Sequence, residues 1–153
     1  ALGNRSILAD PRSPDMKDLI NEKVKHRQWF RPFAPSILRE SVTDWFYKDV
    51  DSPYMTTVLK WRDEVKDKVP AVVHLDGTAR LQTVTENDNS WYYNFIKKFS
   101  KKTDVPIVLN TSFNDREPIV ETPEHAINCF MGTNIDYLYF NTIGKLVRKK
   151  RKI

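Results

Sequence analysis

Three small polar side chains close an apolar run between residues 105 and 117, VPIVLNTSFNDRE. The run reads as a buried β-strand that turns polar at its end, which is where α/β proteins usually present chemistry to a ligand. In an extended chain, side chains two apart share one face, so Asn110, Ser112 and Asn114 are expected to line up together. Two amides and a hydroxyl on one face suit a polar ligand with several oxygens. The alternative is a strand end whose polar side chains only satisfy a turn, and the residues alone leave both open.

Two basic side chains, Lys25 and Arg27, form a second candidate site because only one residue separates them. In a helix, residues two apart point about 200° away from each other, whereas in an extended chain they point the same way. If the two side chains act together, the preceding helix must therefore end by about Val24. An ammonium and a guanidinium on one face would hold a phosphate or carboxyl-phosphate group. The alternative is a solvated helix end, where the helix dipole favours basic residues.

Two further arginines are candidates for binding an anion. Arg80 follows the turn Asp76-Gly77-Thr78-Ala79 and begins a strand that the pattern predicts to be largely buried. A buried arginine needs an anionic ligand or partner, and Asp76 is the alternative partner in a structural ion pair. Arg5 lies in LGNRSI, where small neighbours allow the close approach of a ligand. The histidines and Cys129 show no metal-ligand spacing, so no metal site is assigned, and Cys129 is expected to be a buried structural thiol.

Composition restricts the kinds of protein that this chain can be. Its 153 residues suffice for one domain with a proper core, and 40% hydrophobic residues exclude a disordered chain. No apolar run approaches the roughly 20 residues that span a bilayer, so we expect no membrane association of that kind. The single cysteine allows no internal disulfide, which fits a reducing, cytoplasmic compartment.

The net charge of +5 is concentrated in residues 145–152, which hold six basic side chains. Without them the formal charge falls to −1, so the rest of the chain is close to neutral. We interpret residues 145–153 as a basic tail, more simply a solvated end than a contact for RNA, an acidic lipid surface or an acidic partner. The chain has no initiator methionine and starts as if within a motif, which indicates a fragment of something longer.

Alternating periodicities predict the elements that position these residues. Helices are expected from Ser13-Pro14 to about Val24, over residues 90–102, and from Thr122 to near Gly132. Strands are expected at 70–75 and 80–84, as a hairpin or bend, and at 105–109 and 136–140. Residues 29–38 read as irregular or extended, and residues 41–50 and 53–65 as short helical or loop pieces. This alternation favours an α/β domain around one mixed sheet.

Five motifs in order give the chain a specific resemblance. They are ALGNRSILADPR at 1–12, FRPFAPSIL at 30–38, HLDGTARLQTV at 74–84, VLNTSFN at 108–114 and EPIVETPEHA at 117–126. The series resembles the C-terminal domain of the nodulation-type and antibiotic-biosynthesis O-carbamoyltransferases, and it covers nearly the whole chain to about Leu138. The resemblance implies a YrdC-like α/β fold, a twisted mixed sheet with flanking helices, over residues 1–144.

The same resemblance implies what the candidate residues do. Lys25-His26-Arg27 and Ser112-Phe113-Asn114 match the Lys-x-Arg and Ser-x-Asn pairs that line the nucleotide and carbamate site in the YrdC family. Catalytic roles on phosphate oxygens follow for Lys25, Arg27 and Arg80, and binding of ATP and carbamoyl phosphate follows for Arg5, Asn110, Ser112 and Asn114. No side chain is expected to act as a covalent nucleophile, because positioning and charge promote attack on the α-phosphorus of ATP.

The implied protein is a two-domain enzyme. The YrdC-like half takes carbamoyl phosphate and ATP, with Mg²⁺, and forms carbamoyl adenylate while phosphate and pyrophosphate are released. A separate N-terminal domain, an iron-containing ASKHA-type fold, moves the carbamoyl group onto a substrate hydroxyl and selects the acceptor. The chain departs from the family pattern because residues 114–117 lack glycine, and because the family's Gly-Pro-Arg segment and metal-bearing domain do not precede Ala1. By itself it is expected to make the activated intermediate at most.

Two other functions are compatible with the residues. A YrdC-like fold can carry a basic concave surface for nucleic acid, but the near-neutral body of the chain makes this the weaker hypothesis. The other is a non-catalytic interaction domain that docks to a partner.

Overall fold

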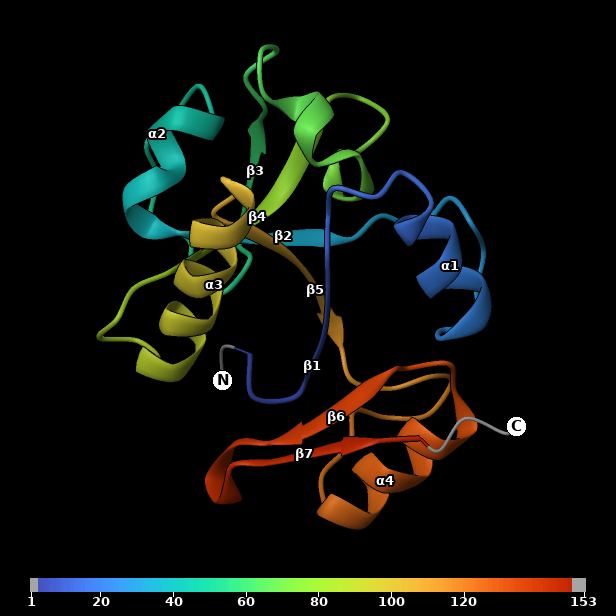
Figure 1. Ribbon diagram of the computed structural model, residues 1–153. Helices are drawn as coiled ribbons and strands as arrows, with labels where there is room; N and C mark the ends of the chain where they lie inside the picture. The colour runs from blue at the N-terminus through green and yellow to red at the C-terminus, as the bar shows by residue number, and fades with distance from the viewer. Residues whose placement is uncertain (1–2, 150–153) are drawn as a thin grey trace.

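A five-stranded sheet occupies the centre of the computed structural model, which describes residues 3–149 (Figure 1). Its strands lie in the order β1-β5-β2-β4-β3, and their bounds in that order are Ser6–Ala9, Ile107–Ser112, Ala34–Leu38, Thr78–Val84 and Thr57–Lys60. Within this sheet β2 and β4 are parallel, and the other neighbouring pairs are antiparallel. A mixed sheet with helices beside it confirms the α/β fold that the sequence predicted.

In chain order the helices are α1 at Met16–Lys23, α2 at Val42–Trp45, α3 at Ser90–Thr103 and α4 at Pro123–Gly132. Side chains cap the starts of helices α3 and α4. The Asn89 side chain accepts a hydrogen bond from the amide of Tyr92 (3.0 Å), and the Thr122 side chain accepts one from the amide of His125 (3.1 Å). The predicted cap at Thr122 is therefore confirmed. No helix among residues 3–149 is long and apolar enough to cross a membrane.

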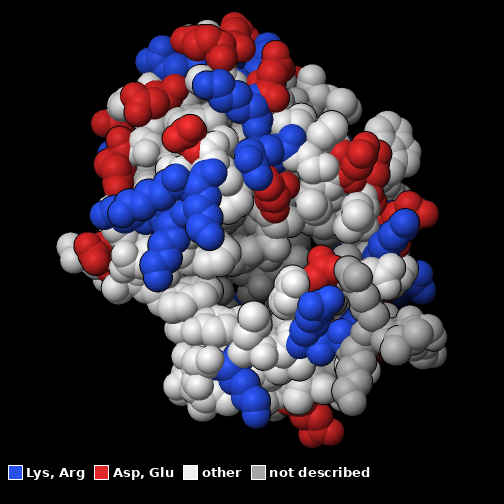
Figure 2. All heavy atoms as spheres, viewed as in Figure 1, with Lys and Arg blue, Asp and Glu red and all other residues white. Residues whose placement is uncertain are grey.

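Two hydrophobic clusters lie on opposite faces of the sheet. Ile37 and Leu109 belong to the larger cluster, whereas Leu38 and Val108 belong to the smaller one, because successive strand residues point to opposite faces. Helix α3 covers the smaller cluster with its buried stripe. Its lysines are exposed, as the amphipathic pattern predicted: Lys97, Lys98, Lys101 and Lys102. Figure 2 shows basic side chains gathered at the left of the view, on the side where Figure 1 draws α3. Each fully buried large apolar side chain contributes about 1.5–3 kcal/mol to the free energy of unfolding.

The predicted strand at residues 70–75 is wrong. Pro70–Val72 form a 3-10 turn, in which the amide of Val73 donates to the carbonyl of Pro70 (3.4 Å). A short apolar run fits either a strand or a buried turn, and proline, which lacks an N–H, favours the turn. Strand β4 therefore has no hairpin partner there. It pairs instead with β3, in a segment that the sequence predicted to be helical or loop.

The ends of two predicted segments also differ. Helix α1 begins at Met16, two residues after the predicted proline start, and its N-cap residue Asp15 makes no capping hydrogen bond with its side chain. The helix ends at Lys23. Joint action of Lys25 and Arg27 required an end by about Val24, so this condition is met.

The start of the predicted basic tail is a strand. Lys145–Arg148 form β7, which is antiparallel to β6 at Tyr137–Phe140. This two-stranded ribbon packs with α4 below the main sheet in Figure 1. Backbone pairing with β6 explains why these charged residues are ordered, since ladder hydrogen bonds do not depend on side-chain polarity. Residues 150–153 of the predicted tail lie outside the described residues.

Candidate functional site

Topology brings the predicted basic residues to one edge of the main sheet. Strand β5 is antiparallel to β1 and β2, so its end at Ser112 lies beside the starts of both strands. Strand β4 starts at the same edge because it is parallel to β2. Arg5 immediately precedes β1, and its carbonyl accepts a hydrogen bond from the amide of Phe113 (3.0 Å). Segments far apart in the sequence therefore converge on the polar end of β5.

The side chain of Lys25 joins the end of α1 to the end of β5. Its Nζ donates to the carbonyl oxygens of Ser112 and Asn114 (2.8 Å each). The same Nζ lies 3.2 Å from the Ser112 hydroxyl and 2.5 Å from Oδ1 of Asn114. The Ser112 hydroxyl also donates to Oδ1 of Asn114 (2.7 Å). Lys25, Ser112 and Asn114 are thus in direct contact, across 87 residues of sequence.

A buried asparagine shapes the loop that carries Lys25 and Arg27. Asn21 of α1 is fully buried, and its Nδ2 donates to the carbonyls of Trp29 (3.2 Å) and Arg31 (3.0 Å). Its Oδ1 accepts a hydrogen bond from Nε of Arg27 (2.7 Å). One amide side chain therefore holds three points of the loop.

Arg27 and Lys25 do not contact the same partners, although they lie close together. His26 between them has a φ of +44°, so the backbone is not the regular extended chain from which a shared face was inferred. The Arg27 guanidinium lies over the ring of Phe33, 4.7 Å from its centroid. Within residues 3–149, the side chain of Arg27 donates a hydrogen bond through Nε. Its two terminal nitrogens are therefore available to a ligand. Ring stacking and the Nε bond hold this guanidinium in one orientation.

The positive charges of this loop are poorly compensated. Lys25 is only 4% exposed, and this burial, followed by the nearby charge of Arg27, lowers its pKa to about 8. Burial and then the charge of Arg31 lower the pKa of Arg27. Like charges that depress each other's pKa favour the arrival of an anion, because an anion would restore the charged forms.

A carboxylate and a thiol lie beside Lys25. Asp115 Oδ2 is 2.8 Å from Nδ1 of His26, whereas Asp115 Oδ1 is buried and has no hydrogen-bond partner among the described residues. Burial and the charge of Asp115 raise the pKa of the Cys129 thiol. A raised pKa is the opposite of what a reactive cysteine needs. Its side chain is half-buried rather than fully buried.

The two predicted arginines outside the loop occupy different positions. Arg5 is exposed at the site edge, and its Nη1 donates to the carbonyl of Val120 (3.2 Å). Arg80 is exposed on β4 opposite Val58, so the predicted burial is wrong. The alternative ion pair with Asp76 is also absent among residues 3–149, because Asp76 Oδ1 accepts from the amide (3.1 Å) and the hydroxyl (2.7 Å) of Thr78. Arg80 remains at the site edge of the sheet, two strands away from Ser112.

Asn110 is not beside Ser112 and Asn114 at the surface. It is buried, and its Nδ2 donates to Oγ of Ser36 (3.0 Å) and Oε1 of Gln82 (2.6 Å). Asn110 precedes Ser112 by two residues and so lies nearer the middle of β5, where α3 covers this face of the sheet. The predicted polar row is therefore split into an interior amide and a pair at the edge.

Three participants were missed by the sequence. Asn21, Arg31 and Asp115 each contribute to the shape or charge of the loop. The signal for Asn21 was a polar residue at a position of the apolar helix stripe, next to Ile20. Asp115 directly follows the recognised Asn114, but nothing in its spacing distinguishes it from a solvated turn residue.

No group of three His, Cys, Asp or Glu side chains that could hold a metal ion exists among residues 3–149.

A protein-family comparison extends the pattern of motifs to the whole domain. The sequence model of the family described as "Carbamoyltransferase C-terminus" matches residues 1–149. This match confirms the resemblance that the five ordered motifs indicated.

Curated relatives match the chain closely and are much longer. An uncharacterized protein of Methanocaldococcus jannaschii is 48% identical over 151 residues, 98% of this chain and 24% of that protein. The nodulation protein NolNO of Sinorhizobium fredii is 48% identical over 156 residues, 99% of this chain and 22% of that protein. The nodulation protein NolO of Bradyrhizobium diazoefficiens is 45% identical over 155 residues, 99% of this chain and 28% of that protein. The chain spans about a quarter of the length of these relatives.

Proposed function

This chain belongs to the carbamoyltransferase C-terminal family, and we propose that it is the part of a carbamoyltransferase that activates the carbamoyl group. Its substrates are carbamoyl phosphate and ATP, and its product is carbamoyl adenylate. A separate N-terminal domain of the same enzyme then transfers the carbamoyl group to a hydroxyl. The observation that carries the proposal is the cluster of Lys25, Arg27 and Arg31 at the polar end of β5, where Lys25 contacts Ser112 and where burial and neighbouring positive charge lower the pKa values of Lys25 and Arg27.

The chemistry consists of two displacements at phosphorus or carbonyl carbon. Water cleaves carbamoyl phosphate to carbamate and inorganic phosphate. A carbamate oxygen then attacks the α-phosphorus of ATP; a P–O bond forms to the carbamate, and the bond to the β-phosphate oxygen breaks to release pyrophosphate. Both steps place negative charge on phosphoryl oxygens, so fixed cations accelerate them without a covalent protein intermediate.

Each residue of the site has a separate role in this chemistry. The terminal nitrogens of Arg27 provide a fork of donors for a phosphate, in an orientation fixed by Asn21 and Phe33. Lys25 adds a second cation, and Ser112 and Asn114 hold its Nζ in place. Arg5 adds an exposed guanidinium beside the same strand end.

Mg²⁺ that arrives with ATP would neutralise phosphate charge at this site. Such an ion needs only one or two protein carboxylate ligands, since phosphates and water supply the others. Asp115 fits this role, because its Oδ1 is buried beside the site without a partner.

Release of pyrophosphate from ATP by the 153-residue chain, in the presence of carbamoyl phosphate, tests the proposal. We expect Arg27→Ala and Asn114→Ala each to lower the rate of pyrophosphate release about 100-fold. Removal of one positioned hydrogen-bond donor, or of the residue that positions it, has an effect of this size in other enzymes. Arg39→Ala is the matched control, since Arg39 pairs with Asp49 at the opposite edge of the sheet. Turnover that is unchanged in both site variants would refute the proposed function.

A further inference from the structure

An exposed apolar surface lies on the two-stranded ribbon of β6 and β7. Tyr137 and Tyr139 of β6 and Leu146 of β7 point to the same face of the ribbon, because side chains alternate along a strand and Tyr139 lies opposite Leu146. These three side chains are 54%, 40% and 62% exposed. The other face, with Leu138 and Val147, packs against the hydrophobic core. The ribbon therefore presents one apolar face to solvent.

Two aromatic side chains of α3 extend this face. The Trp91 ring stacks on the Tyr139 ring, with centroids 5.3 Å apart and an interplanar angle of 14°. Phe95, one turn further along α3, stacks on Trp91 at 5.5 Å and is 39% exposed. We call Trp91, Phe95, Tyr137, Tyr139 and Leu146 the ribbon patch. A contiguous apolar surface of this kind is typical of a contact with another protein surface.

Basic side chains border the ribbon patch. Lys98 and Lys102 continue the stripe of α3 that carries the two aromatic residues, since residues three or four apart share one helix face. Arg148 lies opposite Tyr137 at the other end of the ribbon. All three basic side chains are exposed. An apolar centre with a polar rim is the usual form of a protein interface, and this rim favours acidic residues on the partner.

The start of the described chain lies beside the ribbon patch. Gly3 packs against the ring of Tyr92, since a Cβ added at Gly3 would lie 2.8 Å from that ring. Tyr92 directly follows Trp91, and the two rings are stacked with centroids 6.5 Å apart. In Figure 1 the start of the chain lies near the lower end of α3. Polypeptide that precedes Gly3 in a longer protein therefore emerges next to the patch.

The longer relatives indicate what that polypeptide is. This chain spans about a quarter of their length, and the family that matches it is described as a carbamoyltransferase C-terminus. The larger part of such a protein is therefore expected to precede the matched part and to be joined to it beside the ribbon patch. A covalent connection raises the effective concentration of one surface at the other, so a patch of modest size is enough for docking.

We propose that the ribbon patch is the docking surface for the part of the carbamoyltransferase that precedes Gly3 in the longer polypeptide. That part presents an apolar surface bordered by acidic residues. This inference rests on the proposed function, which assigns transfer of the carbamoyl group to a separate N-terminal domain. It adds the surface through which the two parts of the enzyme are held together.

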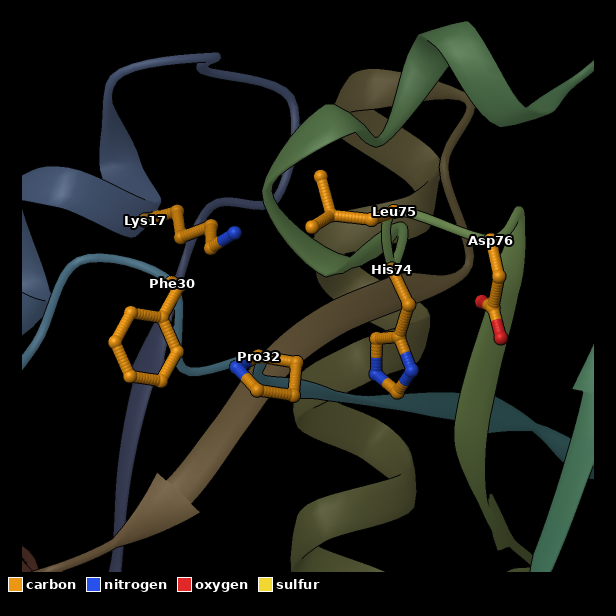
Figure 3. Close-up of a pocket in the computed structure, with 6 residues that line it drawn as sticks. All are labelled: Lys17, Phe30, Pro32, His74, Leu75 and Asp76. Atoms are coloured by element: carbon orange, nitrogen blue, oxygen red, sulfur yellow. The ribbon is translucent and has the colours of Figure 1, made fainter.

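The ribbon patch is separate from the candidate site. An open cavity of about 300 Å³ lies at the site edge of the main sheet, and its lining comes from α1, the loop before β2 and the turn before β4 (Figure 3). The lining residues are Lys17, Phe30, Pro32, His74, Leu75 and Asp76, and none of them belongs to the ribbon patch. Different residues therefore serve docking and the site, so a substitution can change one without the other.

Hydroxyl-radical footprinting, which measures the exposure of individual tyrosine side chains, tests the inference. The 153-residue chain alone is compared with a joined form, in which it replaces the matched part of the Methanocaldococcus jannaschii relative. We expect modification of Tyr137 and Tyr139 to fall about fivefold in the joined form, because side chains that are 54% and 40% exposed become buried in an interface core. Tyr54 is the control, since it is 75% exposed on the loop before β3 and lies outside the patch.

Substitutions in the ribbon patch provide a second measurement. Tyr137→Lys and Leu146→Lys each place a charge in the centre of the contact, and the fold should tolerate both because the side chains are exposed. In the joined form, either change should return modification of Tyr139 to its level in the chain alone, whereas the matched control Tyr54→Lys should not. Pyrophosphate release by the chain alone should be the same in all three variants as in the wild type.

The outcomes separate this inference from the proposed function. If Tyr137 and Tyr139 are modified equally in both forms, or if the lysine variants leave Tyr139 protected, the docking surface is refuted while the proposed function stands. If the two tyrosines are protected in the chain alone and sedimentation shows a dimer, the occupant is a second copy and the inference is again refuted. The footprint does not depend on turnover, so protection in a chain that releases no pyrophosphate would support the docking surface and refute the proposed function.

Discussion

The buried ammonium of Lys25 makes a quantitative prediction about stability. In Lys25→Met, a side chain of similar length removes the charge and the hydrogen bonds to Ser112 and Asn114. The folded chain loses the Lys25 proton near pH 8, whereas in the unfolded chain the lysine keeps it to its ordinary value of 10.5. Between these values the unfolded state binds more protons, so the free energy of unfolding of the wild type rises with pH.

The magnitude follows from the two pKa values of Lys25. The gap between 10.5 and about 8 corresponds to roughly 3 kcal/mol, which is the penalty for a charged Lys25 in the folded state at pH 7. From pH 7 to pH 9 the wild type should recover roughly 1.3 kcal/mol of it, and Lys25→Met should recover none. The comparison between wild type and variant cancels the titration of Tyr92, which both proteins share.

Urea unfolding at pH 7, 8 and 9, followed by tryptophan fluorescence, measures this difference. Lys23→Met is the matched control, because Lys23 is exposed at the end of the same helix and its ammonium stays in water. A constant difference between wild type and Lys25→Met across this range would refute the reasoning. It would mean that the oxygens of Ser112 and Asn114 compensate the buried charge fully, and that the site has no unmet demand for an anion.

Two further predictions concern the support of the site. Asn110→Ala should lower the free energy of unfolding by about 1–3 kcal/mol, because the buried Oε1 of Gln82 loses its 2.6 Å hydrogen bond. Urea unfolding measures the change. An unchanged midpoint would show that the Asn110 amide does not fix β5. Gly3→Ala should destabilise more than Gly144→Ala, since both have positive φ but only at Gly3 would the new Cβ lie 2.8 Å from the Tyr92 ring, with open space at Gly144. Equal shifts in thermal midpoint would show that the Tyr92 contact is not rigid.

Local patterns predicted much of the fold where a single element decides the outcome. The cap at Thr122, the stripe of α3 and the polar end of β5 depend on neighbours within a few residues, and the structure confirms them. The apolar run at 70–75 failed because burial alone does not distinguish a strand from a 3-10 turn. Strand β7 was missed because its basic side chains were read as a solvated tail, whereas backbone pairing with β6 decides its structure.

In the candidate site, too, local patterns predicted the residue types but not their contacts. Residue types and spacing selected Lys25, Arg27, Ser112 and Asn114, and the requirement that α1 end by about Val24 was correct. The partner of each side chain was not readable, because it depends on which strand neighbours which. The hydrogen bonds of Lys25 to β5 and of Asn110 to β2 and β4 join residues tens of positions apart.

The sequence by itself determined the family, the alternation of elements and the cations at the end of α1, since these are written in local periodicity and ordered motifs. Only the tertiary structure decided that Asn110 is interior, that Arg80 is exposed and that Lys25 contacts the end of β5. The physical reason is that side-chain burial depends on what covers each face of the sheet. In this chain the covering elements come from distant segments, such as α3 over Asn110, whose position no local pattern records.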